Sequence, residues 1–181
     1  FSNIKGIKNV QVYANQVGLI RTKIAFEGIV FTGVSTDYDW TFFKEYLIAG
    51  RIPDFNQKRT RDVLLSKTIV NRLQLQLNDT INVTFFKNKA SKLPSNRKLV
   101  ITGIYNTGFL EFDKNIMIGD IRQVQRLNRW NENEVGGFEV ILENFDELQQ
   151  KGAEIYKEID ATLDATTIAS NYPGLFEWIE L

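Results

Sequence analysis

Apolar and polar residues alternate along the first third of the chain, which is the pattern of half-buried β-strands. The alternation covers residues 10–16, 19–27 and 28–35, and Gly28 opens the last of these stretches. The pattern predicts that the fold begins with a meander or a hairpin.

The next segment has apolar residues at helical spacing. Trp40, Phe43 and Leu47 recur at intervals of three and four, which is typical of one face of a helix. An aspartate at 37 or 39 can cap the N-terminus, and Gly50 can end the helix. We predict a helix of about three turns between these residues.

The remainder of the chain switches repeatedly between the two periods, which predicts an α+β fold. Ser66 precedes a helical pattern and is a candidate N-cap. The strands at 78–86 and 98–108 are expected to pair as a long hairpin. The predicted strands are 62–66, 78–86, 98–108, 116–120, 138–144 and 166–170, and the predicted helices are 67–75, 121–130, 145–163 and one that begins at Gly174.

Composition excludes many function classes. The chain has 22 basic and 22 acidic residues, so it has no overall charge that would favour nucleic acid. It has no cysteine and no histidine, which excludes disulfides, thiolate nucleophiles, the Ser-His-Asp triad and imidazole metal ligands. We therefore expect no metal and no cofactor, and any polar recognition must be local.

Four motifs in succession resemble one family. They are YLIAGR within 42–55, LLSKTIVNRLQLQLNDTI within 62–85, VITGIYNTGFLEFD within 99–127, and GGFEVILEN at 136–144. Their order is similar to that in the lipoprotein-releasing permeases LolC and LolE and in the wider MacB-type periplasmic core domain. No stretch of about 18 apolar residues occurs in the chain.

The resemblance implies a two-lobed domain between the first two membrane helices of an ABC-transporter permease of the inner membrane, on the periplasmic side. It implies a porter-like α/β lobe from residues 1–52 and 132–181, and a smaller inserted α/β lobe from residues 53–131. The implied partners are the permease's own membrane helices, an ABC ATPase subunit, a second permease subunit, and a periplasmic lipoprotein carrier or an adaptor.

The segment 87–98 has five basic residues and no acidic residue. A hairpin tip of this kind can attract and orient an acidic partner, and the resemblance places it where LolC-like permeases hold the carrier. The alternative is a solvated tip whose lysines prevent edge-to-edge strand pairing. The candidate partner-binding residues are Lys87, Lys89, Lys92, Pro94, Arg97 and Lys98.

Aromatic residues cluster between 40 and 55. Trp40, Phe43 and Phe55, with Phe42 and Tyr46 beside them, either pack in the core, which their helical spacing favours, or line an apolar surface that binds an acyl chain or a partner.

Two carboxylates stand two residues apart, at Glu111 and Asp113. An acid and base pair of this kind would suit a carboxylate-dependent hydrolase, provided that one carboxyl has a raised pKa in a cleft. Because the resembled family carries acids here without catalysis, a structural role is the favoured interpretation, and we expect no catalytic residue.

The resulting hypothesis is a non-catalytic domain that couples cytoplasmic ATP hydrolysis to lipoprotein release or transfer to a periplasmic carrier. The alternatives are a MacB-type efflux or signalling permease that docks an adaptor, and the hydrolase.

Overall fold

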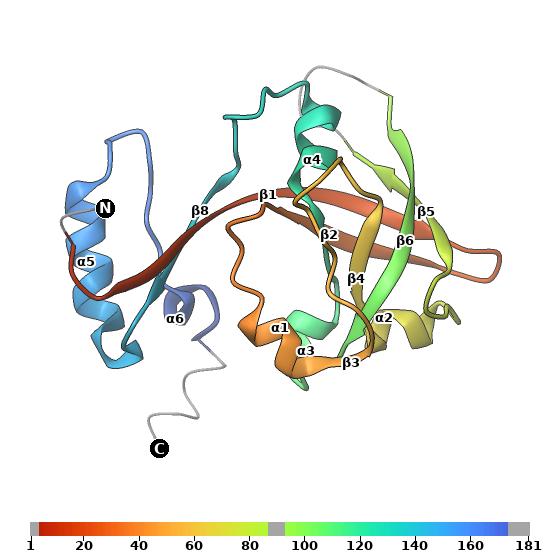
Figure 1. Cartoon of the computed structure of the whole chain (residues 1–181), viewed down its shortest axis with the longest axis horizontal. Coiled ribbons are helices and arrows are strands. Elements are labelled where there is room, and N and C mark those ends of the chain that lie inside the picture. Colours follow the sequence, from red (N-terminus) through yellow and green to blue (C-terminus); the bar gives the residue numbers. More distant parts are fainter. Residues whose placement is uncertain (1–3, 87–92, 174–181) are drawn as a thin grey trace. The chain divides into compact units, whose positions relative to one another are not determined.

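A computed structural model describes residues 4–86 and 93–173 of the chain (Figure 1). The chain separates into two compact units, one of residues 11–139 and one of residues 1–10 with 140–181. The sequence-based boundaries at 52 and 132 differ from these, and the assignment of lobes with those boundaries stays a prediction. Each unit is described by itself below.

The larger unit begins with a long hairpin of strands β1 (Ile7–Arg21) and β2 (Phe26–Val34). The two strands pair antiparallel from Tyr13 with Val34 to Arg21 with Phe26. Thr22 sets the turn, because its hydroxyl accepts a hydrogen bond from the Ala25 amide at 3.1 Å and donates one to the Ala25 carbonyl at 3.0 Å. The break expected after residue 16 was therefore wrong, and one strand runs through it.

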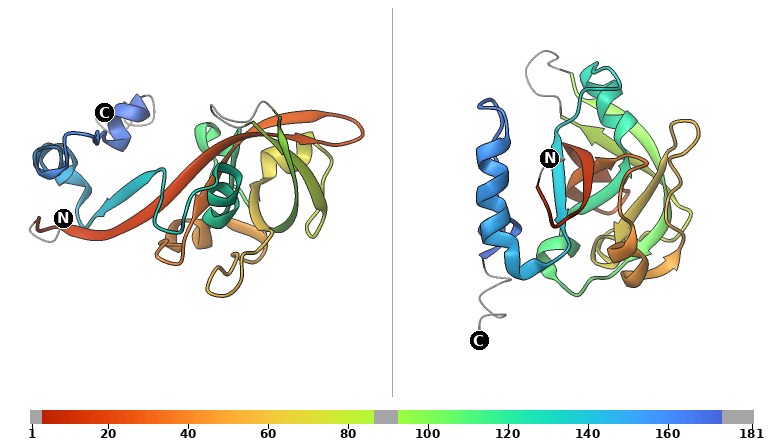
Figure 2. Two further views of the ribbon diagram at one scale, coloured as in Figure 1. Left: turned by 90° about the horizontal axis from the view of Figure 1, so that it is seen from above. Right: turned by 60° about the vertical axis from the view of Figure 1, so that its left-hand side comes forward.

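Six strands of this unit form a closed ring. Since β1 pairs with β2 on one side and with β5 on the other, the sheet closes on itself. The curved strands can be followed from three directions in Figures 1 and 2. Around the ring, β2 is followed by β7 (Ile116–Asp120), β4 (Asp62–Ser66), β6 (Ser95–Tyr105), β5 (Thr80–Phe85) and β1.

The predicted strands at 62–66 and 116–120 are confirmed, as is the antiparallel pairing of the strands predicted at 78–86 and 98–108. The ring contains two parallel pairs, β2–β7 and β4–β6, which the antiparallel pair β4–β7 separates. The pairs β5–β6, β1–β5 and β1–β2 are antiparallel. An alternating pattern identifies such strands, but it does not say which strands become neighbours.

The three-turn helix predicted before Gly50 was wrong. Helix α1 (Thr41–Tyr46) is short, and the chain continues as strand β3 (Leu47–Gly50). β3 pairs antiparallel with β6 beyond the end of the β5–β6 ladder. Backbone groups of β6 that would otherwise lack partners bind this segment, and their hydrogen bonds outweigh its helical spacing.

Gly50 has a positive φ of 76°, and a Cβ there would lie 2.2 Å from the Thr102 carbonyl oxygen. The residue thus permits a left-handed backbone and a close approach between neighbouring strands.

The ring encloses a hydrophobic core that α2 (Lys67–Arg72) and α4 (Ile121–Asn128) complete. Ser66 caps α2 as predicted, because its hydroxyl accepts from the Ile69 amide at 3.2 Å. Helix α4 contributes Val124 and Leu127, which are fully buried. A second cluster has Val34, Phe43, Phe55, Leu64, Tyr105 and Ile118 as its buried members.

The smaller unit includes the start of β1, the end of β8 (Gly137–Leu142), a 3-10 turn (Phe145–Glu147), α5 (Leu148–Glu158) and α6 (Ile168–Asn171). The Glu143 amide donates to the Gly6 carbonyl at 2.9 Å. Helix α5 buries Ile155.

The strand predicted at 166–170 was wrong. This segment forms α6 because the Thr167 hydroxyl accepts from the Ser170 amide at 3.2 Å and caps a helical turn. The helix predicted from Gly174 lies outside the described residues. In the part of the chain that the structure describes, no helix is both long enough and apolar enough to cross a bilayer.

Candidate functional site

The most extensive polar network of the larger unit is built on Asp120, where β7 passes into α4. Its side chain is 1% exposed and caps the helix by accepting from the Arg122 amide at 2.9 Å. The same carboxylate accepts from Arg122 Nε at 2.8 Å and Nη2 at 2.7 Å, and from the Thr60 amide at 2.9 Å. Asp120 therefore joins the helix start to a loop 60 residues away.

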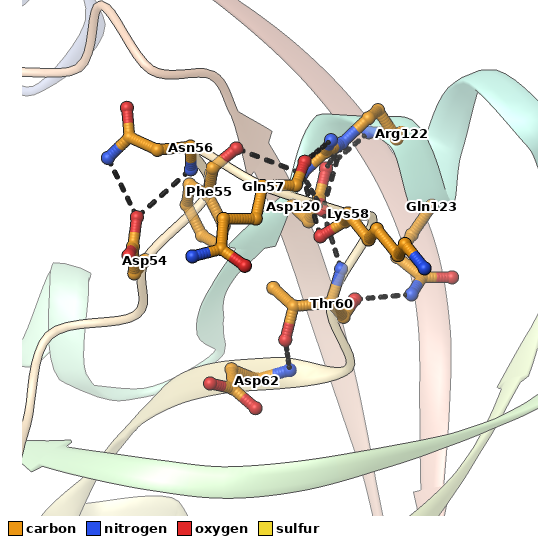
Figure 3. A network of polar contacts seen from close by, with 10 residues as sticks. All are labelled: Asp54, Phe55, Asn56, Gln57, Lys58, Thr60, Asp62, Asp120, Arg122 and Gln123. Atoms are coloured by element: carbon orange, nitrogen blue, oxygen red, sulfur yellow. Dashed lines mark hydrogen bonds and ion pairs between the residues drawn. The ribbon is translucent and has the colours of Figure 1, made fainter.

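Arg122, which forms the ion pair with Asp120, also binds the loop (Figure 3). Its guanidinium donates to the carbonyls of Gln57 at 2.7 Å and Phe55 at 3.0 Å. Gln123 adds a bond to the Thr60 carbonyl at 2.7 Å. Residues 54–60 have no helix or strand, so these side chains give the loop a defined course.

The loop carries basic residues toward the start of β6. Arg59 and Arg61 directly precede β4, which runs parallel to β6 with Asp62 beside Val100. The Val100 amide donates to the Arg61 carbonyl at 2.8 Å and extends this pairing. Because parallel strands start at the same end of a sheet, Arg59 and Arg61 lie at the same end as Arg97 and Lys98.

Arg97 occupies an unusual place in β6. It is on the same face of the strand as Leu99 and Ile101, which are fully buried in the core. Its guanidinium donates to the Ser95 hydroxyl and to the Asn96 carbonyl, both at 2.9 Å. Arg97 thus lies on the interior face of the ring, at the end where that face becomes accessible.

Like charges surround Arg97. Its pKa is lowered, first by burial and then by the charges of Arg126 and Arg59. Arg126 lies one turn after Gln123 on α4, and Gln123 binds the loop that carries Arg59. The guanidinium groups of Arg59 and Arg126, from two other elements, are therefore each within electrostatic range of Arg97.

The carboxylates of Asp62, Asp120 and Asp54 already have hydrogen-bond or ion-pair partners. Asp62 pairs with Arg51 at 2.6 Å, Asp120 pairs with Arg122, and Asp54 binds Asn56. Five basic residues, which we call the basic surface, have no ion pair with an acid among residues 4–86 and 93–173. They are Arg59, Arg61, Arg97, Lys98 and Arg126.

The basic surface overlaps the predicted partner-binding segment only in part. Lys87, Lys89 and Lys92 lie outside the described residues. Pro94 and Lys98 are exposed, and Arg97 is partly buried. Sequence reasoning missed Arg59, Arg61 and Arg126, although the run KRTR at 58–61 is a local excess of charge that could have drawn attention to the first two.

The apolar surface considered for Trp40, Phe43 and Phe55 does not form. Phe43 and Phe55 are 6% and 5% exposed and belong to the second hydrophobic cluster, against which Trp40 packs. The rings of Trp40 and Phe55 lie 5.8 Å apart. Helical spacing indicated core packing here, and the structure agrees with that interpretation.

A different set of aromatic residues is exposed. Phe42 and Phe109 are 40% and 45% exposed, and both rings contact Phe112, at 6.3 and 6.5 Å between centroids. Leu110 beside them is 64% exposed. Phe42 lies on α1, and the other residues lie on helix α3 (Leu110–Asp113) or directly before it. Sequence reasoning placed Phe42 in the cluster for which core packing was favoured, and it did not single out Phe109 or Leu110.

Glu111 and Asp113 do not form an acid and base pair. Asp113 is 4% exposed, and its carboxylate accepts from the Thr107 hydroxyl at 2.9 Å and the Gly108 amide at 3.0 Å. Glu111 instead pairs with Lys114 at 2.5 Å on the same turn. Asp113 therefore organises the loop after β6, and no group of acids that could hold a metal ion occurs among the described residues.

The fold matches that of two solved extracytoplasmic transporter domains. The periplasmic region of MacB from Actinobacillus actinomycetemcomitans aligns over 99% of this chain and 78% of its own, with a TM-score of 0.60 and 16% identity. The extracellular domain of the noncanonic ABC-type transporter YknZ from Gram-positive bacteria aligns over 86% of this chain and 76% of its own, with a TM-score of 0.57 and 16% identity. No family model matches, and no curated protein does. The predicted fold class, the α+β fold of the MacB periplasmic domain, is confirmed.

Proposed function

We propose that this chain is the extracytoplasmic domain of an ABC-transporter permease, and that it couples ATP hydrolysis in a cytoplasmic subunit to movement of a lipoprotein. The domain itself performs no chemistry. It receives motion from the permease's membrane helices and passes the lipoprotein toward a periplasmic carrier.

The fold supports the assignment of the chain as an extracytoplasmic transporter domain. The two solved domains described above are extracytoplasmic regions of transporters, one periplasmic and one extracellular. A membrane-anchored permease with an ATPase subunit and a second permease subunit is the assembly that such a domain would serve. Within it, the lobes assigned from sequence, 1–52 with 132–181 and 53–131, are part of the proposal.

The basic surface supports the second part. It extends the 87–98 segment with three arginines from elsewhere in the larger unit, in a protein whose total charge is zero. A local cluster of unpaired cations attracts an acidic partner and orients it, chiefly by raising the rate of encounter. A periplasmic carrier with an acidic face is the partner that we propose.

An efflux or signalling permease is the second candidate, and the match to MacB favours it. In that case an adaptor would dock in place of the carrier. The hydrolase has no such support, because Asp113 is buried within its own loop and Glu111 is paired with Lys114.

Capture of a lipoprotein carrier by the immobilised domain tests the proposal. We expect the purified carrier to bind the wild-type domain. We expect this binding to be lost when Lys89, Lys92, Arg97 and Lys98 are replaced by Glu. A matched control replaces four exposed cations elsewhere, Arg21, Lys23, Lys44 and Lys67, with the same change in net charge. Equal capture by both variants would refute the assignment of the carrier site, and capture of an adaptor alone would select the second candidate.

A further inference from the structure

We propose that Arg59, Arg97 and Arg126 form a binding site for a phosphate group. The proposal does not depend on the transport function, because it concerns only what these three side chains recognise. It assigns a ligand class to the part of the basic surface where the loop before β4, the start of β6 and helix α4 meet.

The three cations have no anionic partner among the described residues. Like charges in proximity oppose one another, and no carboxylate of the described residues pairs with any of them. The pKa of Arg97 is lowered by burial and by the other two charges, so the guanidinium is held at an electrostatic cost. An external anion placed among the three groups would remove that cost.

Arginine is the residue type that suits a phosphate group. All three groups are guanidiniums, whose planar forks bind phosphate oxygens through paired hydrogen bonds. Only Arg61 and Lys98 among the five members of the basic surface remain outside this set. A tetrahedral anion offers several oxygens in different directions, so it can accept from three forks that arrive from three elements.

Hydrogen bonds hold the Arg97 side chain and the loop that carries Arg59 in place. The Ser95 hydroxyl and Asn96 carbonyl fix one nitrogen of Arg97, each at 2.9 Å. The loop that carries Arg59 is tied to Asp120 by the Thr60 amide at 2.9 Å and to α4 by Gln123 at 2.7 Å. Because the backbone beneath the site is fixed, less conformational entropy is lost when a ligand orders the side chains.

The position of Arg97 in the strand favours a small ligand. Arg97 lies on the interior face of the ring, in line with Leu99, and only its end of the strand is accessible. A compact group reaches such a position more readily than the broad face of an acidic protein. A lipid headgroup and a soluble phosphorylated molecule present the same phosphate oxygens, so either can supply the group.

The test is a titration of the 181-residue chain with inorganic phosphate at constant ionic strength, followed by NMR of the arginine Nε–Hε groups. We expect saturable shifts for Arg59, Arg97 and Arg126. Arg59→Gln and Arg126→Gln should each weaken phosphate binding about fivefold or more, because each removes a charge-assisted pair of hydrogen bonds. Arg21→Gln is the matched control, an exposed arginine on β1 whose loss should leave binding unchanged.

Vesicles distinguish the two sources. If phosphatidylcholine vesicles with added phosphatidic acid sediment the wild type but not Arg126→Gln, the phosphate belongs to a headgroup; if only free phosphate binds, the ligand is soluble. Shifts that rise linearly without saturation, or that are equal at Arg21, would overturn the proposal. Carrier capture without any saturable phosphate binding would overturn it too, while leaving the proposed function intact.

Discussion

Replacing Arg122 with Met tests whether one side chain sets the course of the 54–60 loop. Methionine retains much of the apolar stem but none of the donors. The substitution removes the bonds from the guanidinium to Asp120 and to the carbonyls of Phe55, Gln57 and Lys58. Among residues 4–86 and 93–173, it leaves two backbone amides as donors to the Asp120 carboxylate, which is 1% exposed.

The expected loss follows from these contacts. Removing one member of a buried ion pair costs about 3–5 kcal/mol. The Arg122 side chain is 35% exposed, so water can partly replace it. We therefore expect a loss of about 2–3 kcal/mol in the free energy of unfolding. With a urea dependence of about 2 kcal/mol per molar, the midpoint should fall by about 1–1.5 M.

Urea unfolding followed by tryptophan fluorescence measures this loss. A double-mutant cycle with Asp120→Ser isolates the pair, since serine retains an N-cap oxygen for α4 but carries no charge. The double variant should be more stable than the sum of the single losses predicts, by about 1–2 kcal/mol. A midpoint shift below about 0.3 M for Arg122→Met, or strict additivity in the cycle, would refute the reasoning.

Three further predictions concern single residues. Gly50→Ala should cost more than about 2 kcal/mol in urea unfolding, because the new Cβ would lie 2.2 Å from the Thr102 oxygen at a positive φ; a neutral result would contradict the close approach. Asp113→Ala should cost about 3 kcal/mol and Glu111→Gln less than about 0.5, since only the former carboxylate is buried and organises a loop; equal losses would disagree with the structure. Burial, with the charges of Glu139 and Asp39, raises the pKa of Tyr38 well above its usual value. Its stabilising contribution is thus complete below about pH 10 and is lost as the pH rises toward the folded-state pKa. Between pH 10 and 11.5 the wild type should lose about 2 kcal/mol relative to Tyr38→Phe, and parallel pH profiles would rule this out.

Local signals account for the parts of the fold that were predicted well. Ser66 before an apolar helical pattern identified both the cap and the end of β4, and the short apolar run at 116–120 identified β7. In each case neighbouring residues supply the stabilising contacts. The error at β3 lies where a distant strand decides, because β3 pairs with β6 although its residues have helical spacing. At 166–170 the cap formed by Thr167 outweighed a strand-like composition.

At the candidate site too, local features could be predicted from the sequence, whereas long-range contacts could not. The basic character of 93–98 was visible in the sequence, and so was the core role of Phe43 and Phe55. The contribution of Arg126 was not, because nothing in its own segment separates it from any exposed helical arginine. Likewise, Asp120 and Arg122 could be seen as an N-cap and a first-turn cation, but not as the residues that hold a loop about 60 positions earlier.

By itself, the sequence determined that the chain is an α+β protein of zero net charge, without thiol or imidazole chemistry, and it indicated the fold through the order of its motifs. Only the tertiary structure decided that six strands close into a ring and that the charges of Arg59 and Arg126 act on Arg97 at one end of it. The physical reason is that caps and periodicity act between residues a few positions apart. Strand order and charge clustering depend instead on contacts between segments far apart in the chain, whose pairing depends on the packing of the whole core.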